Sequence, residues 1–594
     1  MSESSTLSEV PSSENIPNKE SNKNTSKKTA RSPFPASFFV ANTMEIFERL
    51  AWYGFFTVSS LYMTSPAIQG GMGFSDTQRG ALQGIVPFFI YLLPAITGAL
   101  GDRYGYRKMM MLAFAIMTPS YYMLGQVSSY GTFFVAFMGV AIGAGIFKPL
   151  ITGTVSRSTD DSNRSLGFGI FYMMVNVGGF LGPIVAGYMR DISWDMVFVM
   201  AAVWIAINFI PVTFFYKDPT QTDRENAIGK SLKHTLLEMQ EVLGNGRLAL
   251  TVLPILIAYM LPGTELISYD TAINFIIVWA LINLVWNIVA KKDSNHWYAS
   301  KIKLGNKPFI VLILILSGFW MVYMQIFITL PLFIRDYVDS SDLVHLFYAI
   351  NPSLGDAVSF VNVEQLTQAI LNLGIKFDIN QADSVRLAYL ELNNYNVRIP
   401  LANIQTLLQS STISANDAAV LAKQWAETYR QFKPEYIAAV NFGSIVLLQV
   451  LVSAISAKFK TFHVLIAGTL MLMASYLVLA SGTSGAILGG AVAVLGLLIF
   501  SIGEMMTSPK QQEYIASVMP KEKAAMYQGY LYTSSAIGFL FAGDLSGKGY
   551  NTWAVQSNSP STFWMLCAAI SLATAIALFL FNRYAADKLE SQHN

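Results

Sequence analysis

The sequence predicts an all-α integral membrane protein, and three observations support this prediction. Hydrophobic residues make up 53% of the 594 residues and charged residues only 13%, whereas soluble proteins carry roughly 25% charged residues. Runs of about 20 apolar residues, long enough to cross a bilayer as helices, recur along the chain. Lys and Arg gather in alternate connections between these runs, as they do on the cytoplasmic side of membrane proteins. We therefore expect a multi-pass protein of the cell (inner) membrane with both termini in the cytoplasm.

The apolar runs predict fourteen transmembrane helices. The seventh run is short and contains Pro254. The runs lie near 37–63, 80–100, 108–127, 131–154, 166–189, 193–216, 248–263, 272–290, 308–334, 436–457, 463–481, 485–507, 524–543 and 562–582.

A polar segment, 336–434, interrupts this pattern between the ninth and tenth runs, on the predicted outer side. Acidic residues outnumber basic ones in it. Helical spacing of apolar residues appears at Val363–Leu373, Pro400–Leu408 and Ser414–Phe432, with Ser414 as an N-cap. A connection of this length is a small domain or a functional element. We expect a helical extracytoplasmic insertion that either only covers the outer face or binds a partner.

Composition excludes several functional classes. The single cysteine, Cys567, lies in an apolar run and the five histidines are scattered, so we expect no disulfide framework and no metal site. The sequence contains no hydrolase, metalloprotease or phosphate-loop motif. We therefore expect no enzyme, no cofactor and no nucleic-acid partner.

The first apolar run contains three charged residues within the span Phe38–Met63. A charge at mid-bilayer depth costs about 3 kcal/mol, so such residues face the protein interior or a water-filled path. Residues spaced three and four apart share one face of a helix. That face would carry Glu45, Glu48, Arg49, Trp52 and Tyr53. It is either a functional site or an ion pair that holds helices together.

The loop between the second and third runs resembles the GxLaDrxGrr motif of the major facilitator superfamily. It reads Gly98-Ala-Leu-Gly101-Asp102-Arg103-Tyr-Gly-Tyr-Arg107-Lys108. Its glycines permit a tight turn. The resemblance implies that Asp102, Arg103 and Arg107 form a conformational latch.

Further motifs resemble the proton-dependent oligopeptide transporters, a branch of that superfamily. They occur in the family's order and cover the chain except for the N-terminal tail and the insertion. They are Glu45-x-x-Glu48-Arg49-Leu50-x-Trp52-Tyr53-Gly54, Gly143-x-Gly145-x-x-Lys148-Pro149, Phe168–Phe180 with Asn176 and Gly178, Phe319-Trp320-x-x-Tyr323-Met324-Gln325, Asn441, and Gly503-Glu504-x-x-x-Ser508-Pro509.

The resemblance implies the major facilitator fold of two six-helix bundles, here with two additional helices of the kind that bacterial members carry. The predicted domains are a disordered cytoplasmic tail (1–36), the N-terminal bundle (37–217), a cytoplasmic linker with the two extra helices (218–307), the first helix of the C-terminal bundle (308–335), the insertion (336–434), the rest of the C-terminal bundle (435–583) and a cytoplasmic tail (584–594).

The resemblance also implies a proton-coupled symporter that imports di- and tripeptides by alternating access, driven by a proton gradient and acting as a monomer. Lys148 and Glu504, lone charges on opposite halves, are expected to form an ion pair. Proton coupling and gating would involve Glu45, Glu48, Arg49, Lys148 and Glu504. Substrate would contact Arg49, Tyr53, Tyr91, Lys148, Asn176, Trp320, Gln325, Asn441 and Glu504.

Two positions depart from the pattern of peptide-transporting members. Where the family has an Arg and a Glu that form a second gate, this chain has Phe56 and Met324. This departure keeps two alternatives open. The chain could transport another small solute, such as an amino-acid derivative, a nucleoside, nitrate or a drug-like compound, or it could be a receptor whose insertion binds a partner.

Overall fold

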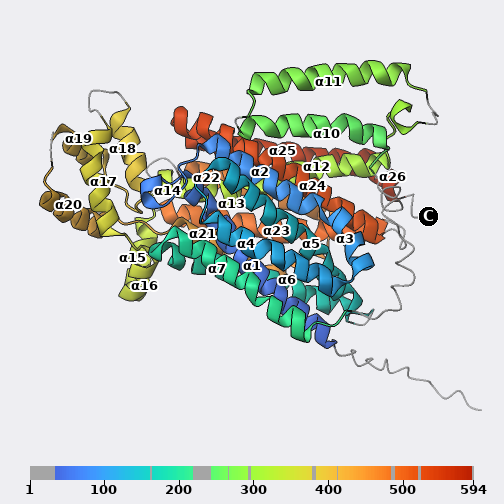
Figure 1. The fold of residues 1–594 in the computed structure, drawn as a ribbon, viewed down its shortest axis with the longest axis horizontal. Coiled ribbons are helices and arrows are strands. Elements are labelled where there is room, and N and C mark those ends of the chain that lie inside the picture. The colour runs from blue at the N-terminus through green and yellow to red at the C-terminus, as the bar shows by residue number, and fades with distance from the viewer. Residues whose placement is uncertain are drawn as a thin grey trace, which may run out of the picture.

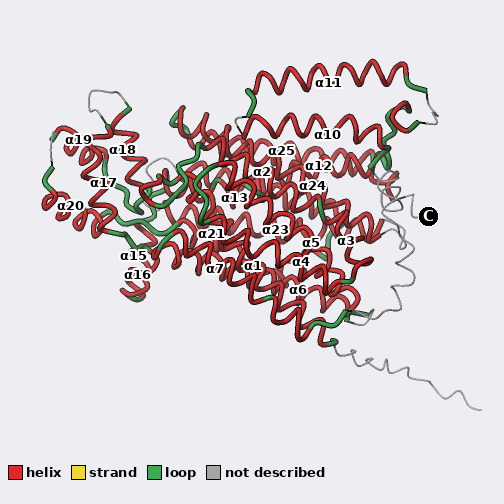
Figure 2. Tube along the Cα trace, in the orientation of Figure 1, coloured by secondary structure: helices red, strands yellow, loops and turns green. Residues whose placement is uncertain are grey.

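A computed structural model of the chain describes residues 34–160, 163–218, 243–264, 266–291, 296–377, 383–410, 413–482, 489–518 and 524–590. Helices form a long bundle with a separate group of short helices at one end (Figure 1). In the described ranges the only β pairing consists of isolated bridges, and Figure 2 shows helices joined by loops. The all-α prediction is confirmed.

The N-terminal half contains seven helices and a short π-helical turn in the described part. Polar caps begin several of them: Ser75 and Gln78 form a capping box, and Ser129 and Ser193 accept backbone N–H groups. The elements are α1 (Ala36–Thr64), α2 (Asp76–Leu92), α3 (Pro94–Tyr104), α4 (Tyr106–Leu124), α5 (Tyr130–Arg157), α6 (Arg164–Ile192), α7 (Trp194–Ile207) and η2 (Pro211–Phe215).

The C-terminal half begins with a helix that breaks into three pieces before the insertion. The pieces are α12 (Lys307–Tyr323), α13 (Gln325–Ile328) and α14 (Leu330–Tyr337). After the insertion follow α21 (Pro434–Ser456), α22 (Thr461–Ser481), α23 (Gly489–Val518), α24 (Ala524–Asp544), η6 (Leu545–Gly549), η7 (Asn551–Gln556), α25 (Pro560–Tyr584) and α26 (Ala586–Glu590).

Ten described helices are long and apolar enough to cross a membrane, so the protein is a multi-pass membrane protein. The other four predicted runs fall on α1, on α2 with α3, on α4 and on α24. Three charges interrupt α1, and α2 ends at Leu92 just before Pro94 begins α3. The total of fourteen spans remains a prediction.

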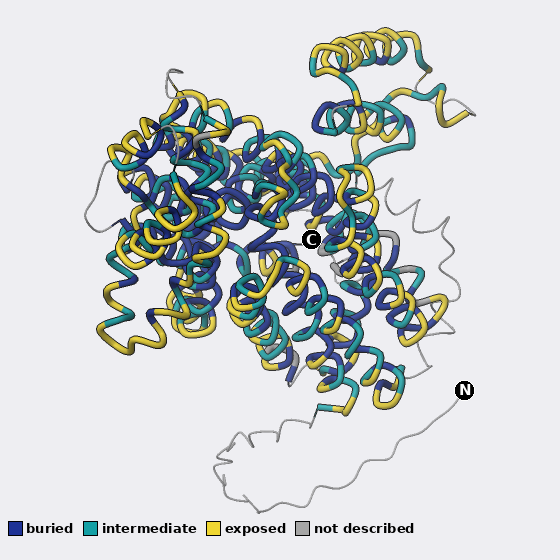
Figure 3. Tube along the Cα trace, turned by 60° about the vertical axis from the view of Figure 1, so that its left-hand side comes forward, coloured by how far each residue is buried: buried dark blue, intermediate teal, exposed yellow. Residues whose placement is uncertain are grey.

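The two extra helices form a hairpin beside the bundle, α10 (Gly246–Met260) and α11 (Tyr269–Val289) (Figure 1). Only 11% of the most apolar stretch of α11 is buried, and Figure 3 shows most of this helix exposed. Arg247 holds the hairpin together: its guanidinium donates to Asn283 Oδ1 (2.6 Å) and Thr251 Oγ1 (3.0 Å) and lies over the ring of Trp286. The exposed face of α11 is therefore a lipid-facing surface.

The insertion is a helical domain with a hydrophobic core of its own. Its helices are α15 (Ser341–Ile350), α16 (Pro352–Val358), α17 (Val363–Lys376), α18 (Ser384–Asn393), α19 (Leu401–Gln409) and α20 (Ala415–Thr428). The three stretches with helical spacing correspond to α17, α19 and α20, and Ser414 caps α20 by accepting from the Asp417 N–H (3.2 Å). The core includes Leu366, Ala388, Leu392, Ile404 and Trp425. The spacing of apolar residues does not predict α15, α16 and α18.

The two halves touch most closely where α2 crosses α24. A Cβ atom at Gly80 would lie 2.3 Å from the carbonyl oxygen of Gly543, and one at Gly84 would lie 2.8 Å from that of Leu540. Small residues at such crossings let helix backbones approach in a membrane. This crossing lies toward the end of the bundle that carries the insertion, which we call the outer end.

Candidate functional site

The charged face of α1 forms one buried cluster. The Arg49 guanidinium pairs with Glu48 and lies 3.2 Å from Glu45 Oε1. The three residues are between 0% and 4% exposed, and Arg49 also lies over the ring of Tyr53 (5.6 Å). The two carboxylates outnumber the one guanidinium, and the ammonium of Lys148 on α5 adds a second positive charge within electrostatic reach of Glu45.

The approach of α6 to this cluster explains why glycine stands at 178. A Cβ atom there would lie 2.5 Å from the Cβ of Arg49 and 2.9 Å from the carbonyl oxygen of Ile46. Any larger residue would push α6 away from α1 or displace Arg49. Asn176, two residues earlier, donates to the Tyr172 carbonyl of its own helix (2.8 Å).

Lys148, on α5, lies against an aromatic ring rather than a carboxylate. Its ammonium is 4.2 Å from the ring centroid of Tyr91, on α2. Tyr91 in turn packs edge-on against Phe539 of α24 (4.9 Å). A cation over a ring face is stabilised by about 0.5–2 kcal/mol, so Lys148 is held on the N-terminal half beside a helix of the other half.

Glu504, on α23, is satisfied entirely within the C-terminal half. It accepts hydrogen bonds from Tyr323 Oη (2.8 Å) and Asn441 Nδ2 (3.1 Å). Ser501 Oγ donates to Asn441 Oδ1 (2.6 Å), which fixes the orientation of the amide. The expected ion pair between Lys148 and Glu504 is absent from this conformation. Two neutral donors, Tyr323 and Asn441, take the place expected for the lysine, so the prediction of a Lys148–Glu504 ion pair is wrong for this conformation.

The remaining predicted substrate residues do not all gather at Glu504. Trp320 packs against Tyr323 (4.9 Å) and Phe539 (5.8 Å), close to the Glu504 partner. Gln325 points elsewhere: it is fully buried and donates to the carbonyls of Met321 and Ala542, each at 3.1 Å. Tyr53 crosses to the other half and contacts Phe442 of α21 (4.6 Å).

Phe56 and Met324, which replace the charged pair of peptide-transporting members, are both in the apolar core. They are 2% and 5% exposed, and Phe56 stacks on Trp52 (4.7 Å). An isolated charge at either position would have no partner there. Replacing both members of the charged pair by apolar residues therefore leaves no unpaired buried charge.

The predicted latch residues lie in helices rather than in a loop: Asp102 and Arg103 are in the last turn of α3, Arg107 is in the first turn of α4, and only Gly105 separates the two helices. The Arg107 N–H donates to Asp218 Oδ1 (2.8 Å), and its guanidinium donates to the Thr213 carbonyl. Arg103 is exposed and lies over the ring of Tyr104 (5.3 Å). The side chain of Asp102 lies outside the described side chains.

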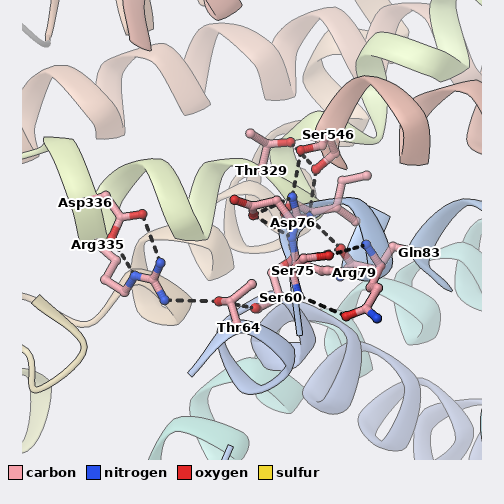
Figure 4. Close-up of polar contacts among 12 residues, drawn as sticks. Ser60, Thr64, Ser75, Asp76, Arg79, Gln83, Thr329, Arg335, Asp336 and Ser546 are labelled. Atoms are coloured by element: carbon pink, nitrogen blue, oxygen red, sulfur yellow. Dashed lines mark hydrogen bonds and ion pairs between the residues drawn. The ribbon is translucent and has the colours of Figure 1, made fainter. Parts of the chain in front are cut away.

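A polar network closes the outer end, and the sequence analysis missed it (Figure 4). Arg79, on α2, is fully buried and donates to the carbonyl (2.7 Å) and hydroxyl (2.9 Å) oxygens of Ser546 in the C-terminal half. The same guanidinium donates to Gln83 Oε1 (2.9 Å), and Ser60 Oγ donates to the Ile328 carbonyl (2.7 Å). Thr329 adds a bond to Ser546 Oγ (2.7 Å).

Two ion pairs join α6 to α21 at the same end. Arg190 Nη1 lies 3.1 Å from Glu435 Oε2, and Lys433 pairs with Asp191. The side chains of Glu435 and Lys433 are 0% exposed. Burial lowers the pKa of Lys433, since the charged form loses hydration. Arg79 lies in α2 and Arg190 in the last turn of α6. The Ser75–Gln78 capping box is the sequence signal that places Arg79 inside a helix.

The chain is similar in sequence to known membrane transporters. Residues 50–362 match the Major Facilitator Superfamily. The chain is 25% identical over 211 residues to the "Uncharacterized transporter YclF" of Bacillus subtilis, covering 33% of this chain and 43% of that protein. It is 29% identical over 165 residues to the "Di-/tripeptide transporter" of Lactococcus lactis subsp. lactis, covering 27% and 33%. The matches thus span less than half the length of these curated relatives.

Solved structures extend the likeness in fold to nearly the whole chain. A crystal structure of a POT family transporter in complex with 5-aminolevulinic acid aligns with a TM-score of 0.58 and 17% identity, covering 93% of this chain and 97% of that chain. The family is one of transporters and not of enzymes. Because the superfamily match covers more than half of the 594 residues, the chain belongs to the Major Facilitator Superfamily.

Proposed function

We propose that the protein is a proton-coupled symporter that imports di- and tripeptides across the cell (inner) membrane, with both termini in the cytoplasm. The observation that carries the proposal is that buried charged groups lie on both halves of the bundle. The N-terminal half holds two cations, Arg49 and Lys148, with Glu45 and Glu48 as counter-ions that a substrate carboxylate could replace, and the C-terminal half holds the carboxylate of Glu504. A zwitterionic peptide matches this arrangement, with its carboxylate toward the cations and its ammonium toward Glu504.

Proton coupling would use Glu504 as the exchanging group. Tyr323 and Asn441 donate to its carboxylate and hold it in place. Protonation would remove its charge and weaken the attraction for a peptide ammonium or for Lys148, which links the proton to the substrate and to movement of the halves. Glu45 and Glu48 compensate Arg49 in the absence of substrate.

Uptake of radiolabelled Ala-Ala into proteoliposomes tests the proposal. We expect accumulation under an inward proton gradient and its collapse when a protonophore is added. Absence of uptake, together with an unchanged melting temperature across a di- and tripeptide library, would contradict peptide transport.

An amino-acid derivative is the second candidate substrate. The aligned POT structure holds 5-aminolevulinic acid, which also carries one carboxylate and one ammonium group. Competition separates the two candidates: an excess of 5-aminolevulinic acid should reduce Ala-Ala uptake only weakly if peptides are the substrate. Strong inhibition by 5-aminolevulinic acid with no accumulation of Ala-Ala would favour the second candidate.

A further inference from the structure

A cavity of about 290 Å³ lies at the outer end, between the insertion and the two membrane halves. The N-terminal half contributes the ends of α1 and α6 and the start of α7, and the C-terminal half contributes Arg335 and Pro434. The N-terminal half also contributes the turn between α1 and α2, with Gln69, and the insertion supplies the remaining wall, including α17. Six lining residues matter for the argument: Ser65, Gln69, Trp194, Asp195, Gln365 and Tyr395.

We propose that this cavity is an outer capture site for small peptides, in which the insertion holds substrate above the closed outer end before the halves separate. The inference rests on the proposed function and adds a second, earlier binding site to it. It also gives the insertion a role in transport.

The side-chain amides of the cavity match a peptide backbone. An amide offers both a donor and an acceptor, which is what a peptide bond requires of its partner. Gln69 lies beside the Tyr395 hydroxyl, and its Nε2 is buried without a hydrogen-bond partner among the described atoms. Gln365 is exposed on α17 and faces the same space. A bound peptide carbonyl would supply the acceptor that Gln69 Nε2 lacks.

Among the charged residues that line the cavity, one carboxylate is not engaged in an ion pair and could bind a ligand. Arg190, Asp191 and Arg335 also line the cavity, but each is engaged in an ion pair. Asp195 makes no ion pair with any described residue and is exposed. It is therefore the group that would bind the peptide ammonium, while Trp194 and Tyr395 provide apolar surface for side chains.

The position of the cavity connects it to the transport path. Its lining includes Leu61 of α1 and Pro434 of α21, helices that belong to opposite halves. Arg190 and Asp191, which pair with α21 and the residue before it, form part of the same wall. When the halves part at the outer end, these contacts break and the cavity opens toward the space between them.

Site-directed labelling of the full chain in nanodiscs tests the capture site. The natural cysteine, Cys567, is fully buried, so an introduced thiol is the main target of an impermeant maleimide. Ala-Ala should slow labelling of the Gln365→Cys thiol about fivefold or more. The matched control is Glu364→Cys, one residue earlier, exposed and outside the cavity lining; its labelling should not change. N-acetyl-Ala-Ala, which lacks the ammonium, should protect much less.

Kinetics give a second readout with a smaller change. Asp195→Asn should raise the external KM for Ala-Ala about fivefold and leave the maximal rate nearly unchanged. Unprotected labelling at Gln365→Cys together with an unchanged KM in Asp195→Asn would overturn the inference. If the wild type takes up Ala-Ala while labelling is unprotected, the capture site alone fails. If labelling is protected but no uptake occurs, the proposed function fails and the binding site stands.

Discussion

The outer end and the charged centre of the bundle solve the problem of buried charge in opposite ways. At the outer end, charges bond across the halves: Arg79 to Ser546, Arg190 to Glu435 and Lys433 to Asp191. At the centre, each charge is compensated on its own half or rests on an aromatic ring. Among the side chains that the structure describes, both ion pairs that join the halves lie at the outer end.

This difference separates the contacts that hold the outer end closed from the central groups that could bind substrate. Opening the outer end must break buried ion pairs, whereas the central groups can exchange partners without parting the halves. None of the bonds that the structure describes for Arg49 and Glu504 joins the two halves, so a ligand could engage these groups while the outer end stays closed. In the proposed alternating-access mechanism this conformation is the outer-closed state.

The largest effect should come from removing Glu435. Glu435→Gln leaves Arg190 without its partner, and breaking a buried pair costs about 3–5 kcal/mol. We expect the outer end to open, seen as a longer distance between spin labels at Ile68 and Leu346, which are exposed on opposite sides of the closure. Adding Arg190→Gln should partly restore the short distance. Glu427→Gln, on the insertion, is the control and should change nothing; an unchanged distance in Glu435→Gln would show that the ion pairs do not hold the closure.

Replacing Arg79 should have the next largest effect. Arg79→Met removes a buried guanidinium bonded to Ser546 and Gln83, and bonds to charged groups contribute about 1.5–3 kcal/mol each. The same label pair should report partial opening. Arg79→Lys keeps the charge but not the planar fork, so it should behave more like Arg79→Met than like the wild type. Wild-type distances in both variants would contradict the network's role.

Removing the insertion separates capture from transport. The deletion should remove 361–430 and keep the first part of the insertion, because Asp342 accepts from the N–H groups of Gly490 and Ala491 at the start of α23. The N–H of Lys433 donates to the Val358 carbonyl (3.0 Å), so a short linker can join the ends. We expect the maximal uptake rate to be retained and the external KM to rise. Complete loss of uptake in a correctly inserted protein would mean that the domain takes part in translocation itself.

The smallest effect concerns the insertion alone. The Tyr348 hydroxyl, and then Arg430, lower the pKa of Asp356, so its contribution to stability is present above about pH 4 and is lost as the pH falls below that value. Hydrogen exchange of α16 and α20 should be slightly faster in Asp356→Asn than in the wild type at pH 7. The difference should vanish at acidic pH; a difference that persists there would show that the carboxylate charge is not its cause.

The sequence predicted much of the fold and the composition of the site, but not how the site's residues pair. Apolar runs fix the spanning helices because each must satisfy its own backbone in lipid, and the Glu45–Arg49 cluster follows from spacing on one helix. The pairing of Glu504 could not be predicted, since Tyr323, Asn441 and Lys148 were all suitable partners and distance decides among them. The role of Arg79 could not be predicted, because Asp76 on its own helix is an ordinary local partner and the bonds to Ser546 join residues 467 positions apart.

The role of Glu504 tests the central claim most directly. Glu504→Gln keeps the two hydrogen-bonding neighbours but cannot change its charge, so the variant should lose uptake driven by an inward proton gradient while retaining exchange of internal for external labelled Ala-Ala. Both activities would be measured in the same proteoliposomes. Loss of driven uptake with preserved exchange is the result we predict. Driven uptake at the wild-type level in Glu504→Gln would contradict the account, since the proton would then enter through another group.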